Sequence, residues 1–123
     1  IDNEVYYADF NWKELLKAIR NVKVSYTEIS KFPAVKRDLA LLLDKKVQFA
    51  EIEKIAYETE KKLLKEVSLF DVYEGKNLEA GKKSYAVSFL LQDENATLND
   101  KQIDKIMSKL VKNLEDKLNA KLR

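Results

Sequence analysis

The sequence predicts an α+β domain in which helices cover one face of an antiparallel sheet. Residues 37–44 hold a short apolar run bounded by charges, as a central strand does. Residues 47–65 carry apolar side chains at three- and four-residue steps, as one face of a helix does. Residues 67–73 and 83–92 are apolar and aromatic segments. The loop between them contains both glycines of the chain, which indicates a hairpin.

The expected strand at residues 37–44 organises the rest of the chain. Pro33 prevents a helix from running into it, because proline lacks an amide hydrogen and restricts the residue before it. Charged residues 36–38 precede five apolar residues, and Asp44 with two lysines follows them. Since the run is short and charged at both ends, we expect it to be buried on one face and partly covered on the other.

Two helices are expected to pack on this strand. The first covers residues 47–65, and its apolar positions are Phe49, Ile52, Ile55, Ala56, Thr59 and Leu63. The second begins where the spacing of Thr97 and Asp100 predicts a capping box. It ends near residue 118, and its apolar positions are Ile103, Ile106, Met107, Leu110, Leu114 and Leu118. Residues 120–123 can form a short last strand.

The order from residue 37 onward is therefore strand, helix, strand, strand, helix, strand. This is the ferredoxin-like βαββαβ order, and right-handed crossovers place both helices on one face of its four-stranded antiparallel sheet. We assign residues 33–123 to this domain. Residues 1–32 form a lead-in with an extended piece and a short helix capped by Asn11. We expect the lead-in to pack on the domain.

The composition excludes several kinds of function. The chain has 123 residues and a net charge of +2, which is too small to indicate nucleic-acid binding from total charge alone. It has no cysteine and no histidine, so it lacks disulfides, thiolate metal ligands and the commonest general base. The sequence shows no pair of a nucleophile and a base that would indicate an enzyme. It also shows no apolar run long enough to indicate a membrane partner. The start at Ile1, without an initiator methionine, leads us to expect a piece of a longer protein.

Alternation along the strands assigns side chains to the two faces of the sheet. Phe70 and Val72 should lie under the helices, together with Leu39, Leu41 and Leu43 and the large apolar residues of the segment 83–92. The opposite face should carry Leu69, Asp71, Tyr73, Ser84, Ser88 and Arg123. An aromatic ring, a cation, hydroxyls and an acceptor on a sheet suit unstacked bases. Each of these residues also occurs as an ordinary exposed strand residue, and that alternative stays open.

Five sequence blocks together resemble one family. They are residues 32–41, 69–75, 81–86, 97–100 and 122–123, which include Phe-Pro-Ala-Val-Lys-Arg-Asp, Phe-Asp-Val-Tyr, Gly-Lys-Lys-Ser-Tyr-Ala and the terminal Leu-Arg. In order and spacing they resemble the ferredoxin-fold anticodon-binding domain, which ends the beta chain of bacterial phenylalanyl-tRNA synthetase. Two positions depart from the family: Ala96 stands where an arginine is frequent, and Asn119 where a glycine is common.

The resemblance implies a set of RNA contacts. Tyr73 would stack on the first anticodon base, and Asp71 would accept hydrogen bonds from a guanine edge. The expected RNA-binding set is Asp71, Tyr73, Ser84, Ala86, Arg123, Lys36 and Arg37. Further basic residues expected at the rim of the sheet, where they could contact phosphates, are Lys82, Lys83 and Lys121.

The resemblance also implies a setting for the domain. The parent would be a cytoplasmic ligase of two alpha and two beta chains that uses ATP and Mg²⁺ to charge tRNA with phenylalanine. Catalysis would lie in the alpha chain, so this domain would be non-catalytic and would hold no cofactor or metal. Its partners would be the phenylalanine-specific anticodon stem-loop, the alpha subunit and the rest of the beta chain. The alternative is a regulatory module of the same fold that binds a small ligand or dimerises through its sheet.

Overall fold

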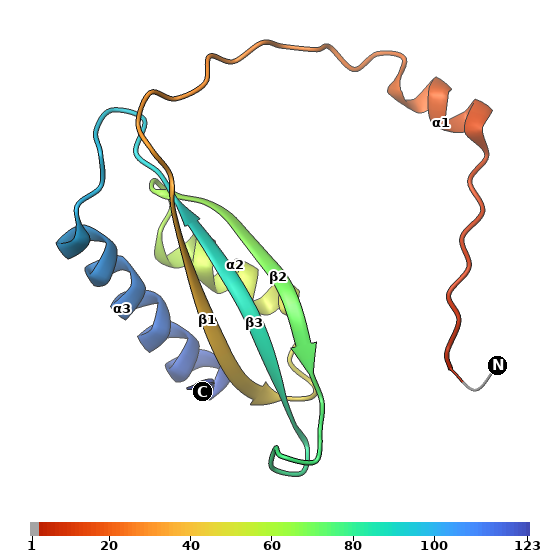
Figure 1. The fold of residues 1–123 in the computed structure, drawn as a ribbon. Coiled ribbons are helices and arrows are strands. Elements are labelled where there is room, and N and C mark those ends of the chain that lie inside the picture. The colour runs from red at the N-terminus through yellow and green to blue at the C-terminus, as the bar shows by residue number, and fades with distance from the viewer. Residues whose placement is uncertain (1–2) are drawn as a thin grey trace.

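The computed structural model describes residues 3–123, and the described part contains three helices and four strands (Figure 1). In chain order they are α1 Trp12–Ile19, β1 Val35–Asp44, α2 Phe49–Thr59, β2 Leu64–Tyr73, β3 Lys82–Leu91, α3 Asp100–Leu118 and β4 Lys121–Leu122. The strands form one sheet in the order β2-β3-β1-β4, and every neighbouring pair is antiparallel. The predicted ferredoxin-like arrangement is therefore confirmed.

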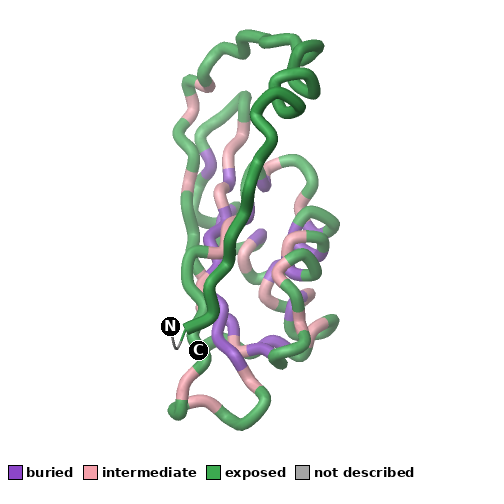
Figure 2. The backbone as a smooth tube through the Cα atoms, turned by 90° about the vertical axis from the view of Figure 1, so that its right-hand side faces the viewer, coloured by how far each residue is buried: buried purple, intermediate pink, exposed green. Residues whose placement is uncertain are grey.

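The core fills the space between the sheet and helices α2 and α3, as the buried segments in Figure 2 show. On the sheet side, the alternate residues of β1 and β3 face the helices, and Leu43, Val87 and Phe89 are completely buried. On the helix side the buried hydrophobic residues are Ile52, Ile55, Ala56, Ile103, Ile106, Leu110 and Leu114. Removing one such side chain from water contributes about 1.5–3 kcal/mol, so this layer determines the fold.

Helix α2 is shorter than the expected helix over residues 47–65. It ends at Thr59 because Glu60 has an extended backbone (φ −136°, ψ 102°). The Glu60 carboxylate then accepts hydrogen bonds from the amides of Lys62 (3.0 Å) and Leu63 (3.1 Å). This tight turn lets β2 begin at Leu64, three residues earlier than the sequence predicted.

Helix α3 begins with a different cap from the expected one. The Asn99 side chain, not Thr97, accepts from the Gln102 amide at 2.9 Å, and the Gln102 side chain accepts from the Asn99 amide at 3.0 Å. These reciprocal bonds form a capping box shifted by two residues. At the other end, Asn119 adopts a left-handed backbone (φ 49°), which asparagine tolerates, and turns the chain into β4.

The described part of the lead-in does not pack on the domain as expected. Residues 3–29 are exposed, including apolar side chains such as Tyr6 (89% exposed) and Val24 (98% exposed). Helix α1 is capped by Asn11 but buries no residue, and Figure 1 shows it well away from the sheet. The core between sheet and helices closes without this segment. The expected lead-in also included residues 1–2, which lie outside the described residues.

Candidate nucleic-acid interface

The face of the sheet opposite α2 and α3 is free of both helices, and we call it the open face. Its residues on β1 and β3 follow from the antiparallel register, in which each open-face residue of one strand pairs with one of the other. These residues are Lys36, Asp38, Ala40 and Leu42 on β1, and Ser84, Ala86, Ser88 and Leu90 on β3. This division between the two faces is the one that alternation along the sequence predicts.

An irregularity in β2 changes which of its residues reach the open face. Leu69 pairs with Val87, yet the next paired residue is Asp71, opposite Ala86, so Phe70 is an extra residue in the strand. Such a bulge bends the strand and reverses the alternation on one side of it. The sequence prediction assumed unbroken alternation, and it is therefore wrong for Leu69 and Phe70, although it is right for residues 71–73.

Two side chains exchange faces as a result. Leu69, expected on the open face, packs against the core, while Phe70, expected under the helices, is 58% exposed. The Phe70 ring lies on the open face, because its centre is 5.8 Å from the ammonium group of Lys36, which belongs to that face. Val72 pairs with the core residue Tyr85, so it lies on the helix-covered face as expected. It is nevertheless half-exposed, because β2 is an edge strand. The sequence contains no signal that would have identified Phe70.

Tyr73 stands at the end of β2 on the open face. Its side chain is 38% exposed, and the guanidinium carbon of Arg123 lies 5.3 Å from the centre of its ring. The Arg123 amide donates to the Ala40 carbonyl at 3.0 Å, which fixes the end of the chain alongside β1. A cation over a tyrosine ring contributes about 0.5–1 kcal/mol at an exposed site. This interaction stabilises the pair, but it is weak enough for a ligand to reach the ring.

The other residues expected at the interface differ in how far they are exposed. Asp71 is exposed on the open face, beside the partly exposed Ala86. Ser84, between Tyr73 and Leu42 in the sheet, is only 6% exposed and is therefore covered in this structure. Ser88 is also buried, and its hydroxyl donates to the Asp38 carboxylate.

The basic residues expected at the rim fall into two groups. Lys36 and Lys121 are exposed and belong to the open face by their register. Arg37 is exposed but pairs with Phe89, which places it on the helix-covered side. Lys83 is 7% exposed, and its ammonium group donates to the Tyr85 hydroxyl at 2.7 Å, so it is held inside the helix-covered layer. Lys82 is partly exposed at the start of β3.

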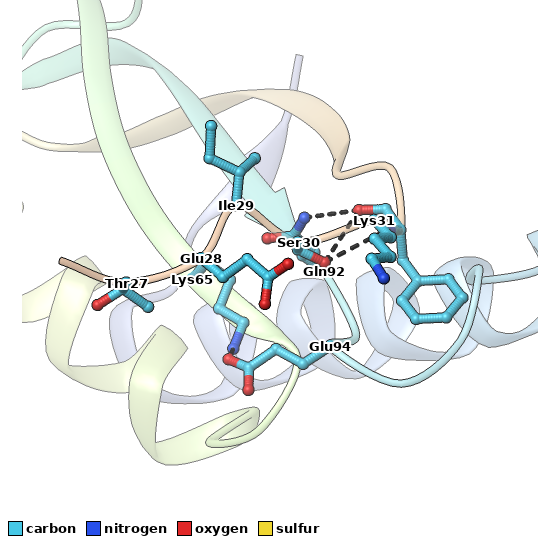
Figure 3. A pocket seen from close by; sticks show the side chains of 9 residues that line it. Thr27, Glu28, Ile29, Ser30, Lys31, Lys65, Gln92 and Glu94 are labelled. Carbon is cyan, nitrogen blue, oxygen red and sulfur yellow. Dashed lines mark hydrogen bonds and ion pairs between the residues drawn. The ribbon is translucent and has the colours of Figure 1, made fainter.

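A separate cavity of about 510 Å³ lies where the lead-in joins the domain (Figure 3). It is lined by residues 27–32 together with Lys65, Gln92 and Glu94. Several of its polar groups already bind each other, since Lys65 pairs with Glu94 at 2.6 Å and the Gln92 amide donates to the Phe32 carbonyl at 2.7 Å. None of the residues expected to bind RNA lines it, and we place the candidate interface on the open face.

Among residues 3–123, no group of three or more histidine, cysteine, aspartate or glutamate side chains could hold a metal ion. No helix in the same range is long and apolar enough to cross a membrane.

Comparison with known proteins assigns the chain to a family. The ferredoxin-fold anticodon binding domain matches residues 30–123. The chain is 93% identical over all its 123 residues to the phenylalanine–tRNA ligase beta subunit of Bacteroides fragilis, and 58% identical to that of Porphyromonas gingivalis. It is 42% identical over 120 residues, 98% of the chain, to that of Bacillus subtilis. It spans only 15% of the length of each of these relatives. The chain belongs to the ferredoxin-fold anticodon-binding domain family.

Proposed function

We propose that the chain is the anticodon-binding part of a phenylalanine–tRNA ligase beta subunit and that its open face receives the anticodon stem-loop of phenylalanine tRNA. The family match and the relatives support the assignment. The observation that carries the proposal is the position of Tyr73, an exposed ring on a sheet face that neither the helices nor the described lead-in covers. Single-stranded loops are bound in this way, by bases that stack on aromatic side chains.

Tyr73 supplies the stacking surface in this proposal, and Asp71 supplies the base-edge contact. The two residues are both exposed and lie two positions apart on β2, which puts them on the same face. A carboxylate only accepts hydrogen bonds, so Asp71 suits the N–H groups on the edge of a guanine and not the acceptors of other bases. Stacking on Tyr73 would bring the first anticodon base within reach of that carboxylate.

Phe70 adds a second ring to the open face. Its exposed side chain with Lys36 beside it resembles the pair of Tyr73 with Arg123, because each ring has one cation near its centre. We include Phe70 and Lys36 in the interface, as a second stacking surface with a charge for the phosphate backbone. Stacking on such a ring does not depend on which base is bound, because every base has a π-face.

The remaining elements of the proposal concern the parent protein. The catalytic alpha subunit, ATP and Mg²⁺ would belong to other parts of a cytoplasmic ligase, since this chain spans 15% of its relatives. Within that assembly the domain would hold one end of the tRNA while the reaction takes place elsewhere. Lys36, Lys121 and Arg123 would supply phosphate contacts, so binding would weaken as salt rises.

The proposal is tested by titrating a synthetic anticodon stem-loop of phenylalanine tRNA into the chain and into Tyr73→Ala. We expect the variant to lose about 1–3 kcal/mol of binding, the usual contribution of one base stacked on an aromatic ring. Tyr57→Ala is the matched control, because Tyr57 is 37% exposed but belongs to α2, on the other side of the sheet. Equal affinities for Tyr73→Ala and Tyr57→Ala would reject the proposal.

The alternative, a module that dimerises through its sheet, is favoured by one observation. The exposed Phe70 and the partly exposed Leu42 and Leu90 lie on the same face. Sedimentation of the chain at increasing concentration separates the two functions. A stable dimer that dissociates on Phe70→Asp substitution and does not bind the stem-loop would favour the alternative.

A further inference from the structure

The two glycines of the hairpin loop serve different purposes. Gly81 has a positive φ of 82°, and a side chain added there would meet no atom within 4 Å. Its role is to adopt a left-handed backbone that other residues avoid. Gly75 is not among the described residues with positive φ, so its backbone does not require a glycine. Another reason must explain the glycine at this position.

That reason is the ring of Tyr73. A Cβ atom added to Gly75 would lie 2.2 Å from the Tyr73 hydroxyl oxygen, 2.3 Å from Cζ and 2.9 Å from Cε1. These distances are shorter than any non-bonded contact between real atoms of this kind, so the ring lies directly against the backbone of Gly75. The tip of the ring therefore occupies the space that any other side chain would fill.

The backbone at Gly75 belongs to a closed turn. The Leu78 amide donates to the Gly75 carbonyl at 3.1 Å, which closes a turn. Glu74, the preceding residue, pairs with Lys45 at 3.0 Å. We expect an added methyl group to displace the Tyr73 ring, because the ring can turn about its side-chain bonds, whereas the Gly75 carbonyl is hydrogen-bonded within the turn.

We propose that Gly75 is a positioning residue, which fixes the Tyr73 ring on the open face by leaving room for its tip. The ring is then held between the Gly75 backbone and the guanidinium of Arg123, 5.3 Å from its centre. A ring fixed in advance loses less freedom when a base stacks on it. This inference rests on the proposed function, because it concerns the side chain that would receive the base.

A double-mutant cycle tests the inference. The stem-loop is titrated into the wild-type chain, Gly75→Ala, Tyr73→Ala and the double variant, and the melting temperature of each is measured. Gly75→Ala should weaken binding about fivefold or more, towards the loss caused by Tyr73→Ala. When it is added to Tyr73→Ala, the Gly75→Ala substitution should change affinity less than about twofold, because substitutions at contacting residues are not additive. Asn77→Ala, in the same loop, should bind like the wild type.

A second readout follows the ring itself. The NMR signals of the Tyr73 ring protons should shift in Gly75→Ala, while the amide signals of the β1 and β3 strands stay in place. If Gly75→Ala alone unfolds, the double variant should recover the melting temperature of Tyr73→Ala, because the clash has been removed.

The outcomes separate this inference from the proposed function. Wild-type affinity in Gly75→Ala, together with weak binding in Tyr73→Ala, would overturn the role of Gly75 alone. An equal loss from Gly75→Ala in both backgrounds would overturn it too, because Gly75 would then act independently of the ring. Wild-type affinity in Tyr73→Ala would instead overturn the proposed function.

Discussion

The guanidinium of Arg123 lies 5.3 Å from the centre of the Tyr73 ring, although the two residues belong to opposite edges of the sheet. Strands β3 and β1 separate β2, which ends at Tyr73, from the short strand β4. The last residue of the chain thus reaches across the open face to the end of the hairpin. One ring and one cation therefore meet at a single place on the open face.

Removal of the Arg123 charge should reduce both the affinity for RNA and its dependence on salt. Each phosphate contact releases counterions, so Arg123→Ala should reduce the slope of log affinity against log salt by about one unit. Arg123→Lys should keep the slope but lose part of the affinity, because lysine lacks the planar group that lies over a ring. Stem-loop titrations at several salt concentrations measure both quantities. An unchanged slope in Arg123→Ala would mean that this side chain contacts no phosphate.

Asp71 should determine which base is preferred. In Asp71→Asn the carboxylate becomes an amide, which donates as well as accepts and no longer favours the N–H groups of guanine. We expect discrimination between a guanine and an adenine at the first anticodon position to fall by about 1–3 kcal/mol, the usual value for one good base-edge contact. The ratio of the dissociation constants for the two stem-loops gives this number. The same ratio in variant and wild type would remove Asp71 from base recognition.

Phe70 should contribute to RNA binding but not to stability. Because its side chain is 58% exposed, Phe70→Ala removes little buried area, and the melting temperature should stay close to that of the wild type. The loss of a stacked base should cost about 1 kcal/mol or more of binding. Val72→Ala is a suitable control, since Val72 is 47% exposed on the same strand but belongs to the other face. If the two variants bind equally well, Phe70 is not a stacking surface.

Deletion of residues 1–29 should leave the domain intact. The side chains of residues 3–29 are exposed, and the hydrophobic core of the described residues draws on later positions, from β1 to Ala120. The truncated chain should therefore melt at the temperature of the whole chain and bind the stem-loop with the same affinity. Calorimetry and titration of the two chains provide the comparison. A clear drop in melting temperature would show that the lead-in packs on the domain after all.

The sequence predicted the elements of the fold well where one hydrophobic period continues through a whole helix or strand. The apolar run of β1 and the stripe of α3 predicted both elements within a few residues, and the two-residue period placed Leu41 and Leu43 in the core. Burial of a continuous apolar stripe dominates the energy of such elements, which is why the pattern is visible in the residues.

The sequence was uninformative where one residue changes the register or the end of an element. The bulge at Phe70 reversed the faces of two residues, and nothing in the local composition distinguishes it from a regular strand. The choice of Asn99 over Thr97 as the cap of α3 depends on small differences between two residues that both cap well. The burial of Ser84 could not be predicted either, because it depends on side chains of the neighbouring strands.

The central claim, that RNA occupies the open face, is tested most directly by an NMR titration of methyl groups with the anticodon stem-loop. The methyl groups of Ala40 and Ala86 pair on the open face, whereas Ala50 and Val111 lie on helices α2 and α3. We predict that the Ala40 and Ala86 signals shift in proportion to bound RNA, while those of Ala50 and Val111 stay in place. Shifts confined to Ala50 and Val111 would put the RNA on the helix layer and contradict the claim.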